Sequence, residues 1–407
     1  MTMSEFKERK FAEICQLFDG PHATPAPSDN GPIFLGIKSI SPDGKIKNDG
    51  IRHISWDQYP MWTKRVTPQE GDIVFSYEAT LHQYCLIPKG FVGCLGRRMA
   101  LLRVNPIEIN NIFLYYYLQS AKWREYITPK IIHGSTVDRI SIKDFPEYSI
   151  QLPDRDLQDK IATIISAYDD LIENNICRIT ILEEMAQKLY HEWFVNFRFP
   201  GHKKIKMVES ELGMIPNGWQ VVRFDSIAKF IKGKKANEST SVHYGNLVPN
   251  ILLDAVASGT YSYVIPDKMV MADRNDIIMV MDGASSGKVI RGEYGAIGST
   301  LAKIETKSQY KNLLYTLLLS NEKEISDNNT GSAIPHANKN FINMKLVCIP
   351  PSDILNRYDK ITNNITLLMQ NLKAKNTNLR KTRDLLLPRL ISGNIDVSNL
   401  DILVREE

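Results

Sequence analysis

Two long stretches of the chain place apolar residues at alternating intervals of three and four positions, a spacing typical of helices that pack along a seam. In the first stretch these positions are Leu157, Ile161, Ile164, Tyr168, Leu171, Asn175, Arg178, Leu182, Met185 and Leu189. In the second they are Ile354, Tyr358, Ile361, Ile365, Leu368, Leu372, Lys375, Leu379, Thr382 and Leu386, each 197 residues after its counterpart. The pattern predicts two long helices that form a coiled coil.

The segments that precede these helices show a different pattern. Short β-branched and aromatic runs, such as residues 72–75 and 276–280, alternate with turn signals such as Asp43-Gly44 and Asp282-Gly283. One helix is expected near residues 108–126 and another near residues 308–325. We therefore predict an α+β protein with two mixed α/β modules and two long helices.

The two modules carry matching segments in the same order, which indicates an internal repeat. FAEICQLFDG from Phe11 corresponds to FDSIAKFIKG from Phe224, and GCLGRRMALLRV from Gly93 corresponds to GAIGSTLAKIET from Gly295. Chance similarity between β-rich domains would not preserve both order and spacing. The sequence therefore predicts two copies of one fold.

The repeat predicts six segments along the chain. These are a first module at residues 1–152, a first long helix at 153–195, a linker at 196–219, a second module at 220–349, a second long helix at 350–395 and a C-terminal tail at 396–407. The simplest closed arrangement packs the helices antiparallel. A helix of about 39 residues spans on the order of 55–60 Å, so the pair would hold two modules at a fixed separation. Two such modules suit a DNA duplex with paired half-sites.

Charge and composition restrict the function less than the repeat does. The chain has 50 Lys and Arg residues and 46 Asp and Glu residues, so DNA binding would require the basic residues to cluster on one surface. The five cysteines are scattered and the eight histidines show no ligand spacing, which predicts no metal site. No apolar run approaches the roughly 18 residues of a membrane span, and we expect a cytoplasmic protein.

We find no motif for catalysis, and we expect no catalytic residue in this chain. Residues 283–288 resemble a phosphate-binding loop, but only three residues separate the two glycines, and Val289 follows Lys288 where a Ser or Thr would hold magnesium. No Gly-x-Gly-x-x-Gly motif follows a strand, and no N/D-P-P-F/Y motif is present. The sequence predicts a recognition protein that binds no cofactor of its own.

Candidate DNA-binding residues are polar or cationic and lie in predicted loops, where they could contact phosphates or base edges. In the first module they are Arg97, Arg98, Ser135, Thr136 and Arg139. In the second they are Lys232, Lys234, Lys235, Ser285, Ser286, Lys288, Ser332, His336, Asn338, Lys339 and Asn340. An arginine here could bind guanine through two hydrogen bonds. The alternative is an ordinary solvated surface.

The sequence resembles the specificity subunit of type I restriction–modification enzymes along essentially its whole length. The resemblance rests on the module–helix order, on the linker at residues 194–224 with its Gly213-Met214-Ile215-Pro216 run and Gly218-Trp219, and on the ending Leu386-Leu387-Pro388-Arg389-Leu390-Ile391-Ser392-Gly393.

The resemblance implies that each module is a target recognition domain for one half of a split DNA site. It implies that the helices separate the modules and dock two modification subunits, which methylate adenine, and that restriction subunits join the complex. S-adenosylmethionine, ATP and Mg²⁺ would then bind in these partner subunits. The alternative from another functional class is a pseudo-symmetric coiled-coil scaffold that docks two partner proteins without recognising DNA.

Overall fold

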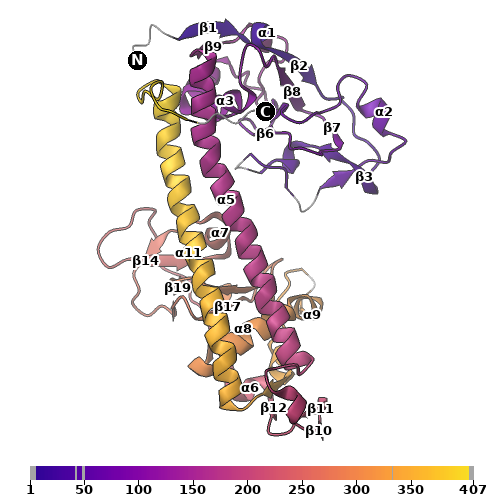
Figure 1. Ribbon diagram of the computed structural model, residues 1–407, viewed down its shortest axis with the longest axis vertical. Coiled ribbons are helices and arrows are strands. Elements are labelled where there is room, and N and C mark those ends of the chain that lie inside the picture. Colours follow the sequence, from indigo (N-terminus) through magenta and orange to yellow (C-terminus); the bar gives the residue numbers. More distant parts are fainter. Residues whose placement is uncertain (1–5, 42–43, 48–50, 332, 403–407) are drawn as a thin grey trace. The chain divides into compact units, whose positions relative to one another are not determined.

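The computed structural model describes residues 6–41, 44–47, 51–331 and 333–402. It consists of two compact units, which are described separately below. Unit 1 comprises Met1–Asn174 with Asn376–Glu407, and unit 2 comprises Asn175–Lys375. Both long helices therefore contribute residues to both units, and each unit also contains one module (Figure 1).

The module of unit 1 is built on two small sheets. A four-stranded antiparallel sheet has the order β2(Cys15–Asp19)-β8(Met99–Val104)-β5(Ile73–Ser76)-β6(Tyr84–Leu86). A three-stranded sheet has the order β4(Arg52–His53)-β3(Ser28–Leu35)-β7(Gly93–Leu95), and its β3–β7 pair is parallel. A separate antiparallel pair joins β1(Lys7–Lys10) to β9(Ser149–Leu152). The helices are α1(Phe11–Ile14), α2(Tyr59–Trp62), α3(Asn111–Gln119) and α4(Ala121–Ile127), with 3-10 turns at Ile37–Ser39, Thr128–Lys130 and Phe145–Glu147.

The module of unit 2 repeats this topology. Its antiparallel sheet has the order β13(Ala228–Lys232)-β20(Leu301–Thr306)-β17(Ile277–Val280)-β18(Val289–Arg291). The second sheet, β15(Tyr263–Val264)-β14(Val248–Ile251)-β19(Gly295–Ile297)-β16(Met271–Ala272), again contains a parallel pair, β14–β19. The strands β12(Gln220–Arg223) and β21(Leu346–Ile349) correspond to β1 and β9. The helices are α6(Phe224–Ile227), α7(Leu253–Ser258), α8(Lys311–Ser320), α9(Glu322–Asp327) and α10(Lys339–Met344), with a 3-10 turn at Ser308–Tyr310. The prediction of two copies of one fold is confirmed.

The helix expected near residues 108–126 is in fact two helices, α3 and α4. They meet at Ser120, which follows the last residue of α3 and caps α4 by accepting a hydrogen bond from the Trp123 amide at 3.3 Å. Serine favours such N-cap positions because its hydroxyl satisfies an amide that the first helical turn leaves unpaired. The break directs Trp123 into the core, where its side chain is fully buried.

A matched pair of glycines shows why the repeat is visible in the sequence. A Cβ atom on Gly20 would lie 2.2 Å from the Gly96 carbonyl oxygen, and one on Gly233 would lie 2.2 Å from the Gly298 carbonyl oxygen. Neither approach is sterically possible for a residue with a side chain. Both modules therefore require glycine where the first strand of the antiparallel sheet meets the turn before its second strand.

The long helices are α5(Arg155–Tyr190) and α11(Ser352–Ile391), and α5 continues as one π-helical turn at His191–Val195. In unit 1 the start of α5, at Leu157 and Ile161, shares a core with Leu390 at the end of α11. In unit 2 the end of α5, at Tyr190, shares a core with Tyr358 at the start of α11. The two helices therefore run antiparallel, as expected.

The seam between the helices departs from the predicted positions. Leu171 is 54% exposed and its neighbour Ile172 only 5%, while Leu368 is 52% exposed. Ile361 is also exposed and Thr362 is buried instead. The reason is geometric, because a straight helix with 3.6 residues per turn drifts by about 20° per heptad from a strict seven-residue repeat. Leu157, Ile161, Ile354, Tyr358 and Ile365 are buried as predicted, and Ile164, Tyr168, Leu182, Leu189, Leu372, Leu379 and Leu386 are half-buried.

The linker after α5 forms a 3-10 turn at His202–Lys204 and a hairpin of β10(Met207–Ser210) and β11(Gly213–Pro216). Ile215 and Trp219 anchor it in the core of unit 2. Across the part of the chain that the structure describes, no helix is long and apolar enough to cross a membrane. Within that part there is also no group of three or more His, Cys, Asp and Glu side chains arranged to hold a metal ion.

Candidate nucleic-acid interface

Three segments of unit 1 meet beyond the end of β5 and form what we call loop cluster 1. They are the loop at residues 77–83, the turn at residues 96–98 and the irregular hairpin at residues 132–140. The residues predicted to bind DNA in the first module all lie in the turn or in the hairpin. The fold therefore brings together residues that are about 40 positions apart in the sequence.

Backbone hydrogen bonds hold loop cluster 1 together. The Tyr77 amide donates to the Arg98 carbonyl at 3.2 Å, and the Tyr77 carbonyl accepts from the Ile140 amide at 2.8 Å. The Ala79 amide donates to the Asp138 carbonyl at 3.0 Å. Because these bonds use only main-chain atoms, the cluster can carry many different side chains without a change in fold.

The side chains of loop cluster 1 are charged and accessible. Arg97 and Arg139 are exposed, and Ser135 and Thr136 are exposed at the hairpin tip. Arg98 is half-buried and forms an ion pair with Glu78, with 2.9 Å between Nε and Oε1. Glu78 was not predicted as a site residue, because it becomes a partner of Arg98 only through contacts between distant segments.

The backbone of loop cluster 1 is strained. Ala79, His82 and Arg98 have φ values of 71°, 63° and 71°, in the left-handed region that residues with a side chain rarely adopt. Such conformations cost on the order of 1 kcal/mol or more each and concentrate at functional sites. Burial lowers the pKa of His82, and the nearby charge of Arg124 lowers it further. The strain is consistent with a loop whose side chains must point in particular directions.

Unit 2 contains the equivalent loop cluster 2, formed by residues 281–288, 298–300, 330–331 and 333–337. The Met281 amide donates to the Thr300 carbonyl at 2.8 Å, and the Met281 carbonyl accepts from the Ala337 amide at 2.8 Å. The Gly283 amide donates to the Pro335 carbonyl at 2.9 Å. These three hydrogen bonds repeat those of loop cluster 1, so Asp282 occupies the place of Glu78 and His336 that of Arg139.

Several residues predicted in the second module lie in or beside loop cluster 2. The Nδ1 atom of His336 lies 2.8 Å from Oδ1 of Asp282, and Lys232 Nζ lies 3.7 Å from the other carboxylate oxygen. Lys288 and Ser285 are exposed in the same loop. Lys234 and Lys235 are exposed after β13, and Lys234 donates to the Lys268 carbonyl at 2.7 Å.

Two of the predicted residues have structural partners instead. Ser286 is 1% exposed, and its hydroxyl accepts a hydrogen bond from Asn329 at 2.7 Å, so we correct its assignment as a DNA contact. The Asn338 side chain caps α10 by accepting from the Phe341 amide at 3.1 Å, which explains its polarity without DNA. Lys339 and Asn340 are exposed on the first turn of α10. Ser332 lies outside the described residues.

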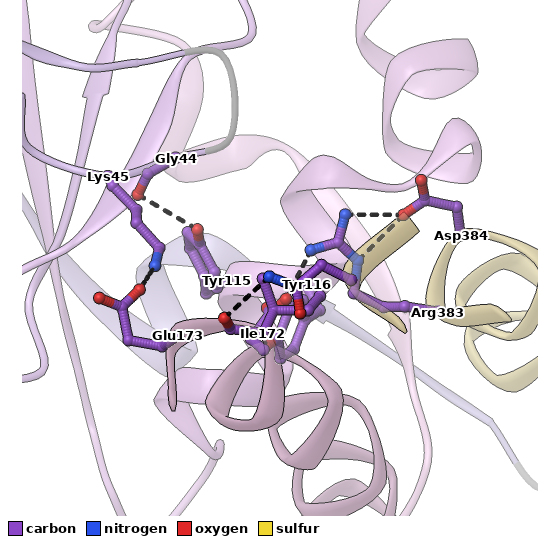
Figure 2. A network of polar contacts seen from close by, with 10 residues as sticks. Gly44, Lys45, Tyr115, Tyr116, Ile172, Glu173, Arg383 and Asp384 are labelled. Carbon is purple, nitrogen blue, oxygen red and sulfur yellow. Dashed lines mark hydrogen bonds and ion pairs between the residues drawn. The ribbon is translucent and has the colours of Figure 1, made fainter. Parts of the chain in front are cut away.

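A polar network attaches the module of unit 1 to α5 and also links α5 to α11 (Figure 2). Tyr116 of α3 donates to Oδ2 of Asp169 in α5 at 2.6 Å, and Arg383 of α11 pairs with the other oxygen of that carboxylate. Lys45 pairs with Glu173 one helical turn further along α5. The network fixes the direction in which loop cluster 1 faces relative to the adjacent portions of these helices.

Unit 2 makes the corresponding attachment with different side chains. Asn312 of α8 donates to Asp359 of α11 at 2.7 Å and accepts from Arg291 of β18 at 2.7 Å. Tyr358 donates to Thr316 of α8 at 3.0 Å. Burial raises the pKa of Asp359, while the Asn312 hydrogen bond and the Arg291 charge oppose that rise. Each module is thus attached by polar side chains to the long helix that follows it in the sequence, α5 in unit 1 and α11 in unit 2.

Comparison with known proteins is consistent with this architecture. The family profile described as "Type I restriction modification DNA specificity domain" matches residues 3–183 and 216–378. The type I restriction enzyme MjaIX specificity subunit of Methanocaldococcus jannaschii is 28% identical over 304 residues, which cover 71% of this chain and 70% of that protein. The HindI specificity subunit of Haemophilus influenzae is 23% identical over 356 residues, covering 70% of this chain and 77% of that protein.

A solved structure shares the fold. The crystal structure of the S subunit of a type I restriction–modification system from M. genitalium superposes with a TM-score of 0.56 and 18% sequence identity, covering 95% of this chain and 96% of that one. At this level of identity the likeness concerns the fold alone.

Proposed function

Because the chain belongs to the type I restriction–modification DNA specificity family, we propose that each of its two modules recognises one half of a split DNA target. The observation that supports this most strongly is the recurrence of one hydrogen-bonded loop cluster in both modules, with different polar side chains on it. A fixed backbone with variable donors and acceptors suits direct recognition of base edges in the major groove.

The basic residues and the histidine around each cluster divide into two groups. Arg98 and His336 are each held by a carboxylate, which suits recognition of particular bases. Arg97, Arg139, Lys235 and Lys288 are exposed and suit contacts with phosphates. Phosphate contacts provide affinity that falls with salt concentration, while base contacts provide specificity.

The long helices would set the number of unspecified base pairs between the two half-sites and dock two modification subunits. Each helix is continuous across both units, and α5 alone, with 36 residues, is about 54 Å long. The exposed Leu171 and Leu368 occupy repeat-equivalent positions, as two docking surfaces for copies of one partner would require.

In this proposal the chain is a non-catalytic, cytoplasmic subunit. The modification subunits would bind S-adenosylmethionine and methylate adenine, and the restriction subunits would use ATP and Mg²⁺. This assignment is supported by the family to which the chain belongs, not by any site in the described residues. Removal of the partners should therefore abolish methyl transfer, while this chain retains its folded modules.

Mapping of methylated adenine in a genome that expresses this chain with its modification subunit tests the proposal. The expected result is a split motif with two short specific parts around a fixed gap. A continuous motif would contradict the two-module arrangement. No sequence preference from a stable complex would favour a scaffold that docks partners without recognising DNA.

Paired insertions test the role of the helices separately. One heptad inserted after Arg178 and another after Lys375 lengthen both helices by about 10 Å, which should widen the gap by up to roughly three base pairs. The half-sites themselves should not change. The control is the α5 insertion alone, which shifts the register of the two helices and should weaken the complex. An unchanged gap with the double insertion would contradict the proposal that helix length sets the gap.

A further inference from the structure

We propose that Glu78 and Asp282 are positioning residues, each of which directs one base-recognising side chain of its own module: Arg98 in loop cluster 1 and His336 in loop cluster 2. This inference rests on the proposed function and adds to it the residues that determine specificity. It assigns a role to two acidic residues that a DNA-binding surface would otherwise exclude, because a carboxylate repels phosphate.

The two carboxylates occupy the same place in the fold. Each follows the central strand of its antiparallel sheet by two positions, since β5 ends at Ser76 and β17 at Val280. Glu78 lies between Tyr77, whose amide binds the turn, and Ala79, whose amide binds the hairpin. Asp282 lies in the same way between Met281 and Gly283. Glu78 forms an isolated bridge with Arg139, and Asp282 forms the same bridge with His336. Coincidental surface acids would not share this position in both copies.

The contact between Glu78 and Arg98 leaves the end of the arginine side chain available. The Nε atom of Arg98 is buried and lies 2.9 Å from Oε1 of Glu78 in an ion pair that lacks hydrogen-bond geometry, and the side chain as a whole retains 31% exposure. The two terminal nitrogens, which form the fork that binds O6 and N7 of guanine, make no hydrogen bond or ion pair with the described residues. A guanidinium restrained by an ion pair loses less freedom when it binds, because its planar fork is already partly oriented.

The backbone at Arg98 supports the same role. Glycine would adopt its φ of 71° without strain, yet the residue is an arginine. Ala79, in the same cluster, has the same strained φ. Strain of this kind persists only where surrounding contacts enforce it. Backbone strain, a buried nitrogen and an ion pair thus all restrict the direction of the Arg98 side chain.

His336 is held in an analogous way by a different atom. A carboxylate only accepts hydrogen bonds, so the contact of Nδ1 with Asp282 at 2.8 Å places a proton on Nδ1. The other ring nitrogen, Nε2, has no hydrogen-bond partner among the described residues, and the side chain is 50% exposed. The imidazole therefore presents Nε2 outward, and the second module recognises its base with a ring nitrogen instead of a guanidinium fork.

The test measures methylation by the complete modification complex on the wild-type target and on targets with single base changes. R98Q should lower the preference for guanine at one position of the first half-site by roughly 5- to 150-fold, the range for one bidentate contact. E78Q should reduce discrimination at that same position and at no other. D282N and H336Q should both reduce base discrimination at the same single position of the second half-site.

The matched control is E147Q, which removes an exposed glutamate from an ion pair with Lys10 in the same module. It should leave discrimination unchanged at every position. The double variant E78Q/R98Q should lose no more discrimination than R98Q alone, because a positioning residue acts through the side chain that it directs. E78D, which keeps the carboxylate, should restore part of the preference that E78Q loses.

The outcomes separate this inference from the proposed function. If E78Q lowers methylation of all targets equally, or leaves discrimination intact, Glu78 is not a positioning residue and the inference is overturned. Thermal unfolding of each complex distinguishes equal lowering caused by misfolding from a true effect on recognition. If the wild-type complex has no base preference at any position, the proposed function itself fails, and the inference fails with it.

Discussion

The two loop clusters share a backbone and differ in the side chains that it carries. The same three main-chain hydrogen bonds connect the loop, the turn and the hairpin in both modules. In the first module the cation beside the carboxylate is Arg98, from the turn, whereas Thr300 stands at that place in the second. In the second module the side chain beside the carboxylate comes from the hairpin instead, as His336. The comparison shows that the fold does not depend on the residues that would determine specificity.

The attachments of the two modules to the helices differ in the same way. Unit 1 uses a charged pair, Arg383 and Asp169, together with Tyr116, while unit 2 uses the amide of Asn312 with Asp359. In both, a polar side chain on a module helix reaches a carboxylate on a long helix. Conservation of geometry with divergence of chemistry therefore extends from the loops to the attachments, and four experiments test how far it holds.

The largest effect is expected from the aromatic residue that opens each repeat. Phe11 and Phe224 are 1% and 0% exposed, and replacement of either by alanine should cost about 3–5 kcal/mol of unfolding free energy. Each variant should destabilise mainly its own unit, which scanning calorimetry can follow if the units unfold in separate transitions. Replacement of Ile107, which is 83% exposed, is the control. A large difference between the two losses of unfolding free energy would show that the modules are not equivalent.

The second test concerns the matched glycines. Gly20→Ala and Gly233→Ala each place a Cβ atom 2.2 Å from a carbonyl oxygen, so the backbone must move, at a cost of about 2–3 kcal/mol. Gly36→Ala is the control, because its Cβ would meet only a ring carbon at 3.7 Å and its φ is −99°. Chemical denaturation measures the difference. Tolerance of alanine at either glycine would contradict the close approach.

A third, smaller effect is expected from the direct ion pair, which is present in the attachment of unit 1. Arg383→Met leaves Asp169 without its cation at a partly buried position and should cost about 1–2 kcal/mol. The double variant with Asp169→Asn should recover part of that loss, because no uncompensated charge remains. A double-mutant cycle measures the coupling between these two residues. Additive losses would show that Arg383 does not stabilise the network through Asp169.

The smallest effect is expected from the buried carboxylate of unit 2. Burial raises the pKa of Asp276, but the Asp273 amide, Lys303 and Lys311 together outweigh burial and lower it overall. A lowered pKa in the folded state adds stability that is present above about pH 4 and is lost as the pH falls through the folded value. Asp276→Asn should therefore cost about 1 kcal/mol near neutral pH and progressively less in acid. A constant loss across that range, measured by denaturation at each pH, would contradict the assignment.

The sequence predicts the parts of the fold that depend on local pattern. The long helices follow from periodicity, which depends on residues that are close in the sequence. The paired glycines follow from the internal repeat, which can be seen by aligning the two halves of the chain. The break at Ser120 is less visible, since the apolar pattern continues through it. The shift from Leu171 to Ile172 arises from helix geometry accumulated over several turns, which a strict heptad count does not include.

The candidate site was only partly predictable for a similar reason. Polar and cationic residues in predicted loops can be identified from the sequence, and Arg98 and His336 were found in that way. Glu78 and Asp282 could not be found, because their significance depends on contacts with segments 20 to 60 residues away. One available signal was position, since both are acidic and both lie two residues after a short strand that is fully buried and mostly apolar. Ser286 shows the opposite error, in which a polar residue in a glycine-rich turn serves only the turn.

The composition of unit 1 has a consequence for how the chain folds during synthesis. Its core includes Leu390 and Ile391, and Lys160 donates to the Ser398 carbonyl, so contacts across more than two hundred residues complete it. Unit 2 is one continuous segment, and its residues all leave the ribosome before those of α11 that unit 1 needs. Translation proceeds from the N-terminus, and long-range contacts form late. The module made first should therefore be the last to complete its core.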